Sequence, residues 1–301
     1  MNYVIYLGVL LIWATTPLAI KLGASDTSPL EALSLRIVLA FLVGAAIATL
    51  MGRFGLNIRE RWQHYLAASL GIFPNFVLVY YATQFISSGL VSLLFALSPF
   101  VMAPMASRVL GEAPLRSNQL VALLMALAGL TLIFYDQINI NATAYIGVGL
   151  MMGSVSLFAI SNIWMKYLGR GVDIDPAEQT LGAMAFSLPG ILLCWYWIDG
   201  MVITVPVGPG LFAIAYLSVF GSLVGFVAYF YLLKRMTISS VSLIPLITPG
   251  LALLIGALVA NETVSGRTIV GAVSILFALS LHQGILQSLV KIVSRRQRMS
   301  L

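Results

Sequence analysis

The chain has 301 residues, of which 60% are hydrophobic and 9% are charged. A soluble globular domain carries about a quarter charged residues, so this composition excludes an ordinary water-soluble fold and favours an integral membrane protein. The 16 Lys and Arg residues outnumber the 10 acidic residues, but their positions indicate membrane topology rather than a nucleic-acid partner.

Hydrophobic runs of about 20 residues, bounded by Gly, Pro or charged residues, follow one another along the chain. They cover residues 3–22, 30–51, 65–85, 88–108, 118–135, 144–166, 179–198, 210–233, 238–260 and 268–290. About 20 residues of helix cross the roughly 30 Å hydrocarbon core of a bilayer. The first run lacks a basic n-region and a cleavage site, so we expect it to be retained as a membrane helix. Prolines inside several runs predict kinks.

Lys and Arg residues are divided unequally between the two sides that these spans create. Thirteen lie on one side, Lys21 and Arg267 lie on the other, and Arg36 lies within the second span. The positive-inside rule therefore predicts that both termini lie in the cytoplasm and that the protein crosses the cytoplasmic membrane many times. Residues 291–301 form a basic cytoplasmic tail that we expect at the surface of the lipid bilayer.

The second half of the chain repeats features of the first. Tyr81, Pro99 and Glu112 recur 150 residues later as Tyr231, Pro249 and Glu262, and Lys21 recurs 145 residues later as Lys166. We predict two five-helix repeats, over residues 1–138 and 144–290. Because an odd number of spans inserts the second copy in the opposite orientation, the predicted fold is an all-α integral membrane bundle of ten transmembrane helices in two inverted repeats. Such repeats support alternating access to a site at their interface.

These residues also carry a resemblance to a known family. The ordered features are Trp13-Ala14 with Lys21, Pro29 with Arg36, Pro99 before Gly111-Glu112, and Pro249 with Glu262. From Gly8 to about Leu281 the chain resembles the EamA-like branch of the drug/metabolite transporter (DMT) superfamily. The resemblance implies export of amino acids, related metabolites or drugs. The chain departs from the pattern at Ala14, where a glycine is usual, and at Ala183, where the repeat would place a second arginine.

Arg36 is the first candidate for substrate binding. It lies about six residues, roughly 9 Å, inside the outer end of its span, where a lone charge costs on the order of 3 kcal/mol. Glu31 is about 140° away around the helix and is a poor partner for it. Capture of a substrate carboxylate is one interpretation; snorkelling or an ion pair with another helix is the other.

Polar and aromatic side chains in the paired spans are the other cavity candidates. They are Trp13, Thr16, Asn75, Tyr81 and Ser98 in the first half, and Ser161, Asn162, Tyr229 and Thr248 in the second. The repeat aligns Thr16 with Ser161, so both halves could offer a hydroxyl to one site. Hydrogen bonds between helices are an equally good account of these groups.

Four charges at helix ends are candidate gate residues. Lys21 and Lys166 are interpreted as membrane anchors or as gate charges. Glu112 and Glu262 are interpreted as helix-end caps or as gate partners of Arg116 and Arg267, with proton coupling as the alternative. Because no acidic residue lies at a helix centre, facilitated export or exchange is favoured over strong proton coupling.

Motifs that are typical of other classes of protein are absent from this sequence. There is no Walker A loop, no G-x-S-x-G and no H-E-x-x-H, and the two His residues have no ligand spacing, so we expect no catalytic residue, metal site or cofactor. We predict a secondary transporter that exports or exchanges a small amphipathic metabolite, such as an amino acid or a related compound. A drug or toxic-compound efflux carrier is the alternative, and a channel or membrane-embedded enzyme is the alternative from another class. The oligomeric state stays open, and a monomer is compatible with these features.

Overall fold

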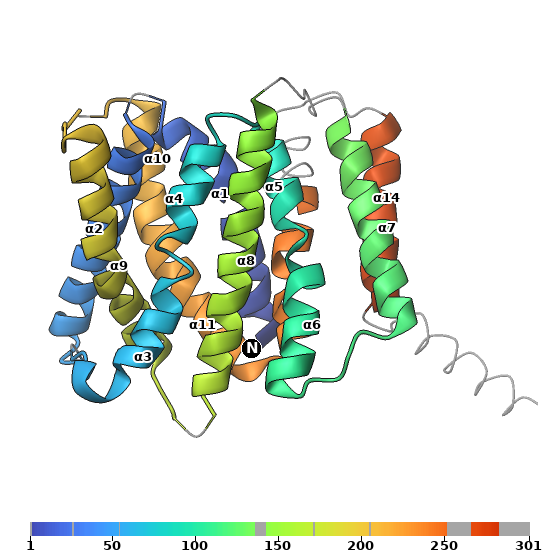
Figure 1. The fold of residues 1–301 in the computed structure, drawn as a ribbon, viewed down its shortest axis with the longest axis horizontal. Coiled ribbons are helices and arrows are strands. Elements are labelled where there is room, and N and C mark those ends of the chain that lie inside the picture. Colours follow the sequence, from blue (N-terminus) through green and yellow to red (C-terminus); the bar gives the residue numbers. More distant parts are fainter. Residues whose placement is uncertain are drawn as a thin grey trace, which may run out of the picture.

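The computed structural model describes residues 2–282 except Asp26, Phe54, 136–142, Gly171, Val205 and 252–265. In this part of the chain the regular elements are helices, which stand side by side in one bundle (Figure 1). Each predicted hydrophobic run contains helix, so the predicted all-α fold class is confirmed. Glu262 and the tail 291–301 lie outside the described residues.

Five of the predicted spans form single helices. They are α1 (Asn2–Gly23), α2 (Pro29–Leu50), α7 (Ser117–Phe134), α8 (Ala144–Leu168) and α9 (Pro176–Asp199). The starts of α2 and α9 follow from the same local chemistry. Ser28 caps α2 by accepting a hydrogen bond from the Glu31 backbone N–H at 3.0 Å, and Asp175 caps α9 through Ala177 at 2.8 Å. Proline follows each cap at the first helical position, where its missing N–H costs nothing.

The remaining spans are interrupted or are described only in part. The third consists of α3 (Ile58–Ser69) and α4 (Asn75–Ala82), and the fourth of α5 (Ser88–Phe95) and α6 (Ser98–Leu110). The eighth contains α10 (Pro209–Tyr216), the π-helix η2 (Leu217–Val224) and α11 (Gly225–Arg235). The ninth begins with α12 (Ile238–Val241) and resumes over residues 244–251, and the tenth contains α14 (Gly266–His282).

Proline explains where two of these spans break. The sequence predicted continuous runs over 65–85 and 88–108, but the helices stop before Pro74 and before Ser98-Pro99. Proline lacks the N–H that a helix needs, and its ring crowds the preceding turn. By contrast, α1 and α9 continue through Pro17 and Pro189.

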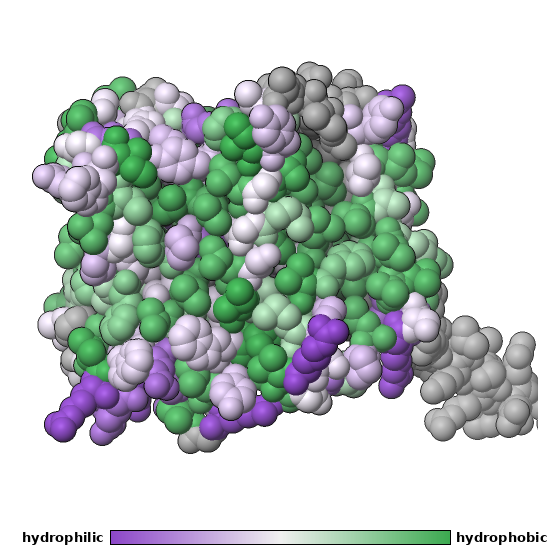
Figure 2. Space-filling view, in the orientation of Figure 1, coloured by the Kyte–Doolittle hydropathy of each residue, from purple (hydrophilic) through white to green (hydrophobic). Residues whose placement is uncertain are grey.

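The bundle has the surface of a membrane protein. Six described helical segments are long and apolar enough to cross a membrane: Asn2–Gly23, Pro29–Leu50, Leu90–Leu110, Ala144–Leu168, Pro176–Asp199 and Pro209–Arg235. Ser117–Gly129 and Ile238–Leu251 are shorter apolar helices. Figure 2 shows a broad apolar band across the visible face of the bundle, with hydrophilic side chains gathered mainly at its lower edge. Large apolar residues such as Leu42, Trp197 and Phe212 are exposed in a way that a bilayer, but not water, accommodates.

The two halves interlock, and their first helices run in opposite directions (Figure 1). The first helix of each half packs on the third span of the other: α1 contacts α10, η2 and α11, whereas α8 contacts α3 and α4. The second helices follow the same rule, since α2 packs on η2 and α9 packs on α3. A continuous seam between the halves therefore passes through the middle of the bundle.

Candidate functional site

A cavity of about 90 Å³ lies in this seam. Both halves line it, through α1, α2, α4 and α5 from the first and α8, η2, α11 and residues 245–248 from the second. Four of the predicted candidates contribute to its wall, namely Trp13, Thr16, Arg36 and Thr248. We call this space the central cavity.

Arg36 supplies the charge of the central cavity. Its side chain is buried, with 1% of the residue exposed. The Nε group donates a hydrogen bond to Ser222 Oγ at 2.7 Å, Nη1 lies 3.5 Å from the Tyr80 hydroxyl, and the guanidinium carbon lies 4.6 Å from the centre of the Phe76 ring. Among the described residues no carboxylate oxygen lies within 4.0 Å of this guanidinium. Arg36 is thus held by neutral groups only.

Glu31 is engaged elsewhere, as its position on the helix predicted. Its buried carboxylate accepts a hydrogen bond from the Thr204 backbone N–H at 2.5 Å. The neighbouring cap residue Ser28 donates to Asp199 at 2.5 Å. These contacts fasten the N-terminal end of α2 to the end of α9 and the loop that follows, and they leave Arg36 without an acidic partner on its own helix.

The π-helix η2 explains how Arg36 is accommodated. A π-helical turn widens the helix and is often found at functional sites. Here it presents Ser222 and Gly221 to Arg36. A Cβ atom on Gly221 would lie 3.6 Å from Arg36 Nη2, so the glycine leaves room beside the guanidinium on the cavity side.

Four hydroxyl groups line the same cavity. Thr16 donates to the carbonyl of Ile12 at 3.0 Å, Thr83 to Tyr80 at 2.7 Å, Ser92 to Ser88 at 3.0 Å and Thr248 to Pro245 at 3.2 Å. Each hydroxyl proton is therefore donated to a backbone carbonyl of the same segment. A hydroxyl that donates in this way keeps its lone pairs, so these side chains can accept hydrogen bonds from a ligand.

An aromatic cluster closes the seam beside the central cavity. Trp13 stacks on Tyr229 with ring centroids 4.7 Å apart, and it meets Phe158 and Phe226 edge-on at 6.3 and 6.2 Å. The Tyr229 hydroxyl donates to Asn162 Oδ1 at 2.8 Å. The structure thus brings three candidates, Trp13, Tyr229 and Asn162, together from both halves, with the last two packed behind the cavity wall.

The other candidates bond between or within helices. Asn75 and Ser154 exchange two hydrogen bonds, at 3.1 and 2.9 Å, and Ser161 donates to the Ala67 carbonyl at 2.7 Å. Ser98 donates to the carbonyl of Phe95, just before α6 begins. The geometry of these groups matches the helix-bonding alternative in the sequence interpretation, and they do not line the central cavity.

Tyr81 does not line the central cavity, and neither does its neighbour Tyr80, but Tyr80 contacts Arg36 from behind the wall. Tyr81 is partly buried, whereas Tyr80 is fully buried and reaches Arg36. Tyr80 follows Phe76 by four residues, so both side chains lie on one face of α4. Val77 and Tyr81 have the same spacing, so the sequence does not show which of the two tyrosines faces Arg36. Ser222 carries no signal in the sequence either, because its role depends on the π-helical turn.

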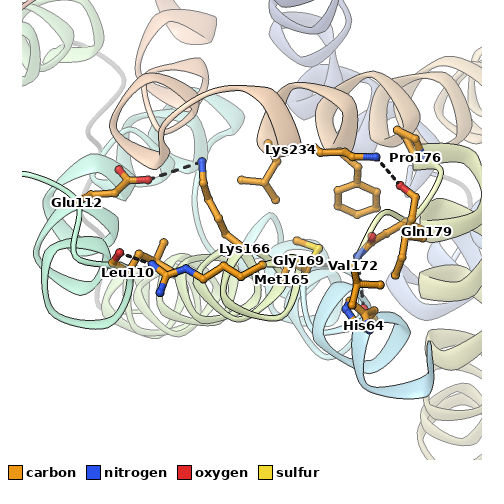
Figure 3. Close-up of a pocket in the computed structure, with 14 residues that line it drawn as sticks. His64, Leu110, Glu112, Met165, Lys166, Gly169, Val172, Pro176, Gln179 and Lys234 are labelled. Carbon is orange, nitrogen blue, oxygen red and sulfur yellow. Dashed lines mark hydrogen bonds and ion pairs between the residues drawn. The ribbon is translucent and has the colours of Figure 1, made fainter. Parts of the chain in front are cut away.

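A second cavity, of about 280 Å³, opens at the end of the bundle where α8 finishes, and we call it the vestibule (Figure 3). Its polar lining comes from His64, Glu112, Lys166, Arg170, Gln179 and Lys234. On α8 the central cavity touches Phe158, whereas the vestibule touches Met165 and Lys166, about two turns further along. The aromatic cluster with Asn162 lies between the two spaces.

Glu112 and Lys166 form an ion pair at the vestibule, with 3.6 Å between nitrogen and oxygen (Figure 3). Glu112 also accepts hydrogen bonds from the backbone N–H of Ile238, at 3.1 and 3.2 Å, and Lys166 donates to the carbonyl of Met236. Of the two interpretations of Glu112, the structure thus shows a cap at the start of α12, and the ion pair that it forms is with Lys166 rather than with Arg116. Gly111, in the left-handed conformation at φ 69°, ends α6 and turns Glu112 toward α8 and α12.

Two further ion pairs lie at the same end of the bundle, and the first of them joins the two halves. Arg61 of α3 pairs with Glu178 of α9 at 2.5 Å, and Lys234 pairs with Asp173. The hydrogen bond to Glu178 raises the pKa of the Arg61 guanidinium. By contrast, Lys21 is exposed at the far end of α1. The described residues contain no cluster of three or more His, Cys, Asp or Glu side chains that could hold a metal.

The Glu112–Lys166 contact predicts a measurable change in access to the vestibule. Replacing Glu112 with Gln should increase the reactivity of a cysteine placed at Leu233 by roughly threefold to tenfold, because the pair and the cap on α12 are weakened. The measurement is the labelling rate with a membrane-impermeant maleimide, in a Cys194→Ser background. Arg116→Gln is the matched control and should leave the rate unchanged. An equal effect of both changes would argue against a specific Glu112–Lys166 contact.

Comparison with known proteins agrees with this architecture. The model of the EamA-like transporter family matches residues 2–135 and again residues 145–282. A chloroplastic WAT1-related protein of Arabidopsis thaliana is 26% identical over 289 residues, covering 89% of this chain and 66% of its own length, so this chain spans just under two thirds of that relative. A probable amino-acid metabolite efflux pump of Escherichia coli (strain K12) is 24% identical over 296 residues, covering 93% of each chain.

A solved crystal structure shares the fold. It superposes with a TM-score of 0.77 at 17% sequence identity, over 94% of this chain and 98% of that one. The two family matches lie on the two interlocking halves whose seam holds the central cavity. The chain belongs to the EamA-like transporter family.

Proposed function

We propose that the protein is a secondary transporter that exports or exchanges a small amphipathic metabolite bearing a carboxylate, such as an amino acid or a related compound. The observation that carries this proposal is Arg36, a buried cation in a cavity shared by both halves, held by Ser222, Tyr80 and Phe76 and by no carboxylate of the described residues. A guanidinium in such a place is stabilised by an anionic ligand.

Alternating access at the seam is the proposed mechanism. The central cavity and the vestibule lie on opposite sides of the aromatic cluster, and the vestibule end is tied by Glu112, Lys166 and Ile238. Opening that end while closing the other would expose Arg36 to the opposite side of the membrane. Inverted repeats allow this exchange because the two halves can trade conformations. The name of the E. coli relative, an amino-acid metabolite efflux pump, supports the cargo class and the export direction.

Counterflow in liposomes tests the transport function. Purified protein is reconstituted into vesicles preloaded with one unlabelled small carboxylate or amino acid, and the transient accumulation of the same labelled compound is followed. Accumulation that needs both the protein and the internal cargo is the expected result. A cargo-independent ion current of high conductance, without counterflow, would favour a channel instead.

We also propose that both termini lie in the cytoplasm, as the distribution of Lys and Arg predicts. Fusions of a cytoplasm-active fluorescent protein to each end should both fluoresce, and alkaline phosphatase fusions at the same ends should both be inactive. Opposite results at the two ends would contradict the arrangement of two five-span halves, because an even number of spans returns the chain to its starting side.

A further inference from the structure

The net charge of the central cavity restricts its cargo. Arg36 is the only charged side chain among the described residues that line it. Glu31, the nearest acid along the chain, accepts a hydrogen bond from Thr204, and Asp199 accepts one from Ser28. A monoanion in the cavity would make the complex neutral. A zwitterion would leave one positive charge uncompensated at membrane depth, and a cation would leave two, and such charges are costly there.

The guanidinium is oriented so that one edge stays available. Nε is committed to Ser222 at 2.7 Å, and one face lies over Phe76. Nη1 has only the distant contact with Tyr80 at 3.5 Å, and no described residue accepts a hydrogen bond from Nη2, which lies beside Gly221. The Nη1 and Nη2 edge is the part of arginine that binds both oxygens of a carboxylate.

The rest of the cavity offers acceptors and apolar surface. The hydroxyls of Thr16, Thr83, Ser92 and Thr248 each donate to a carbonyl of their own segment, so toward a ligand they act as neutral acceptors. A neutral donor such as a hydroxyl satisfies an acceptor of this kind without adding charge. Ile20, Val79, Phe95 and Phe158 complete an apolar wall.

We infer that the central cavity selects a monoanionic carboxylate with an apolar body and a neutral hydrogen-bond donor, such as a hydroxy acid, over the zwitterionic amino acid of the same skeleton. The inference rests on the proposed function, in which Arg36 binds the cargo carboxylate. It restricts the proposed carboxylate cargo to compounds with a net charge of minus one.

Four compounds of one branched skeleton test the selection: α-hydroxyisovalerate, isovalerate, valine and isobutylamine. Their binding to the purified full-length protein in nanodiscs is measured by isothermal titration calorimetry at neutral pH. The hydroxy acid should bind about tenfold or more tighter than valine, from the uncompensated charge, and about threefold tighter than isovalerate, from one added hydrogen bond. Isobutylamine should bind most weakly. The ranking is obtained on the unaltered chain, so it does not depend on the folding of a variant.

Two variants test whether Arg36 causes this order of affinities. Arg36→Lys should weaken binding but keep the preference for the anion over valine, because the charge remains, whereas Arg36→Gln should abolish that preference. Valine binding at least as tightly as the hydroxy acid would overturn the inference, and counterflow of valine in the same preparation would leave the proposed function standing. Absence of both binding and counterflow for all three carboxylates would overturn the inference and the proposed function together.

Discussion

Replacing Arg36 with Gln is expected to reduce counterflow of a carboxylate cargo by roughly tenfold to a hundredfold. A charge-assisted hydrogen bond contributes about 1.5–3 kcal/mol, and each 1.36 kcal/mol corresponds to a factor of ten. Glutamine keeps a polar side chain near Ser222 but cannot supply the positive charge or the two-nitrogen edge. The measurement is the initial rate of counterflow in liposomes, with a carboxylate cargo and with an uncharged analogue of the same size.

The uncharged analogue separates binding from structure. Its transport should change little in Arg36→Gln if Arg36 acts on the cargo, whereas an equal loss for both compounds would support a structural role for the arginine. Arg59→Gln is the matched control, since Arg59 is exposed at the start of α3 and does not line the central cavity. It should leave both rates unchanged.

Replacing Gly182 with Ala is expected to destabilise the bundle by about 1–3 kcal/mol, the usual cost of overpacking a core. A Cβ atom there would lie 2.2 and 2.5 Å from two ring carbons of Tyr65, far inside contact distance. Tyr65 is fully buried and donates a hydrogen bond to Glu178 at 2.5 Å, so its ring cannot move without loosening the contact between α3 and α9. The measurement is the thermal unfolding midpoint of the purified protein in one detergent.

Two other glycines provide controls for the change from glycine to alanine. Nothing lies within 4 Å of the position that a Cβ would take on Gly8 of α1 or on Gly149 of α8. Ala at either position should be neutral or slightly stabilising, because alanine has the higher helix propensity. If Gly182→Ala unfolded at the same temperature as these two variants, the close approach of α9 to Tyr65 would be refuted.

Much of the architecture follows from the sequence alone, because it depends on composition and on patterns that repeat along the chain. A chain this apolar must satisfy its backbone within helices in the bilayer, which sets the class of fold. Caps such as Ser28 and Asp175 mark where helices begin. The repeated features identified two related halves, and the isolated charge of Arg36 marked it as unusual before any contact was known.

Tertiary structure alone decided which side chains meet. The sequence could not show which of Tyr80 and Tyr81 faces Arg36. Neighbouring residues point about 100° apart around a helix, and only the packed structure shows that the Tyr80 side is the one turned toward Arg36. Ser222 depends on the wider turn of η2, and the pairing of Glu112 with Lys166 depends on the turn at Gly111. Helix formation is governed by residues within a turn of one another, whereas these contacts join segments far apart in the chain. The contacts of Ser222 and Lys166 form only when the two halves interlock.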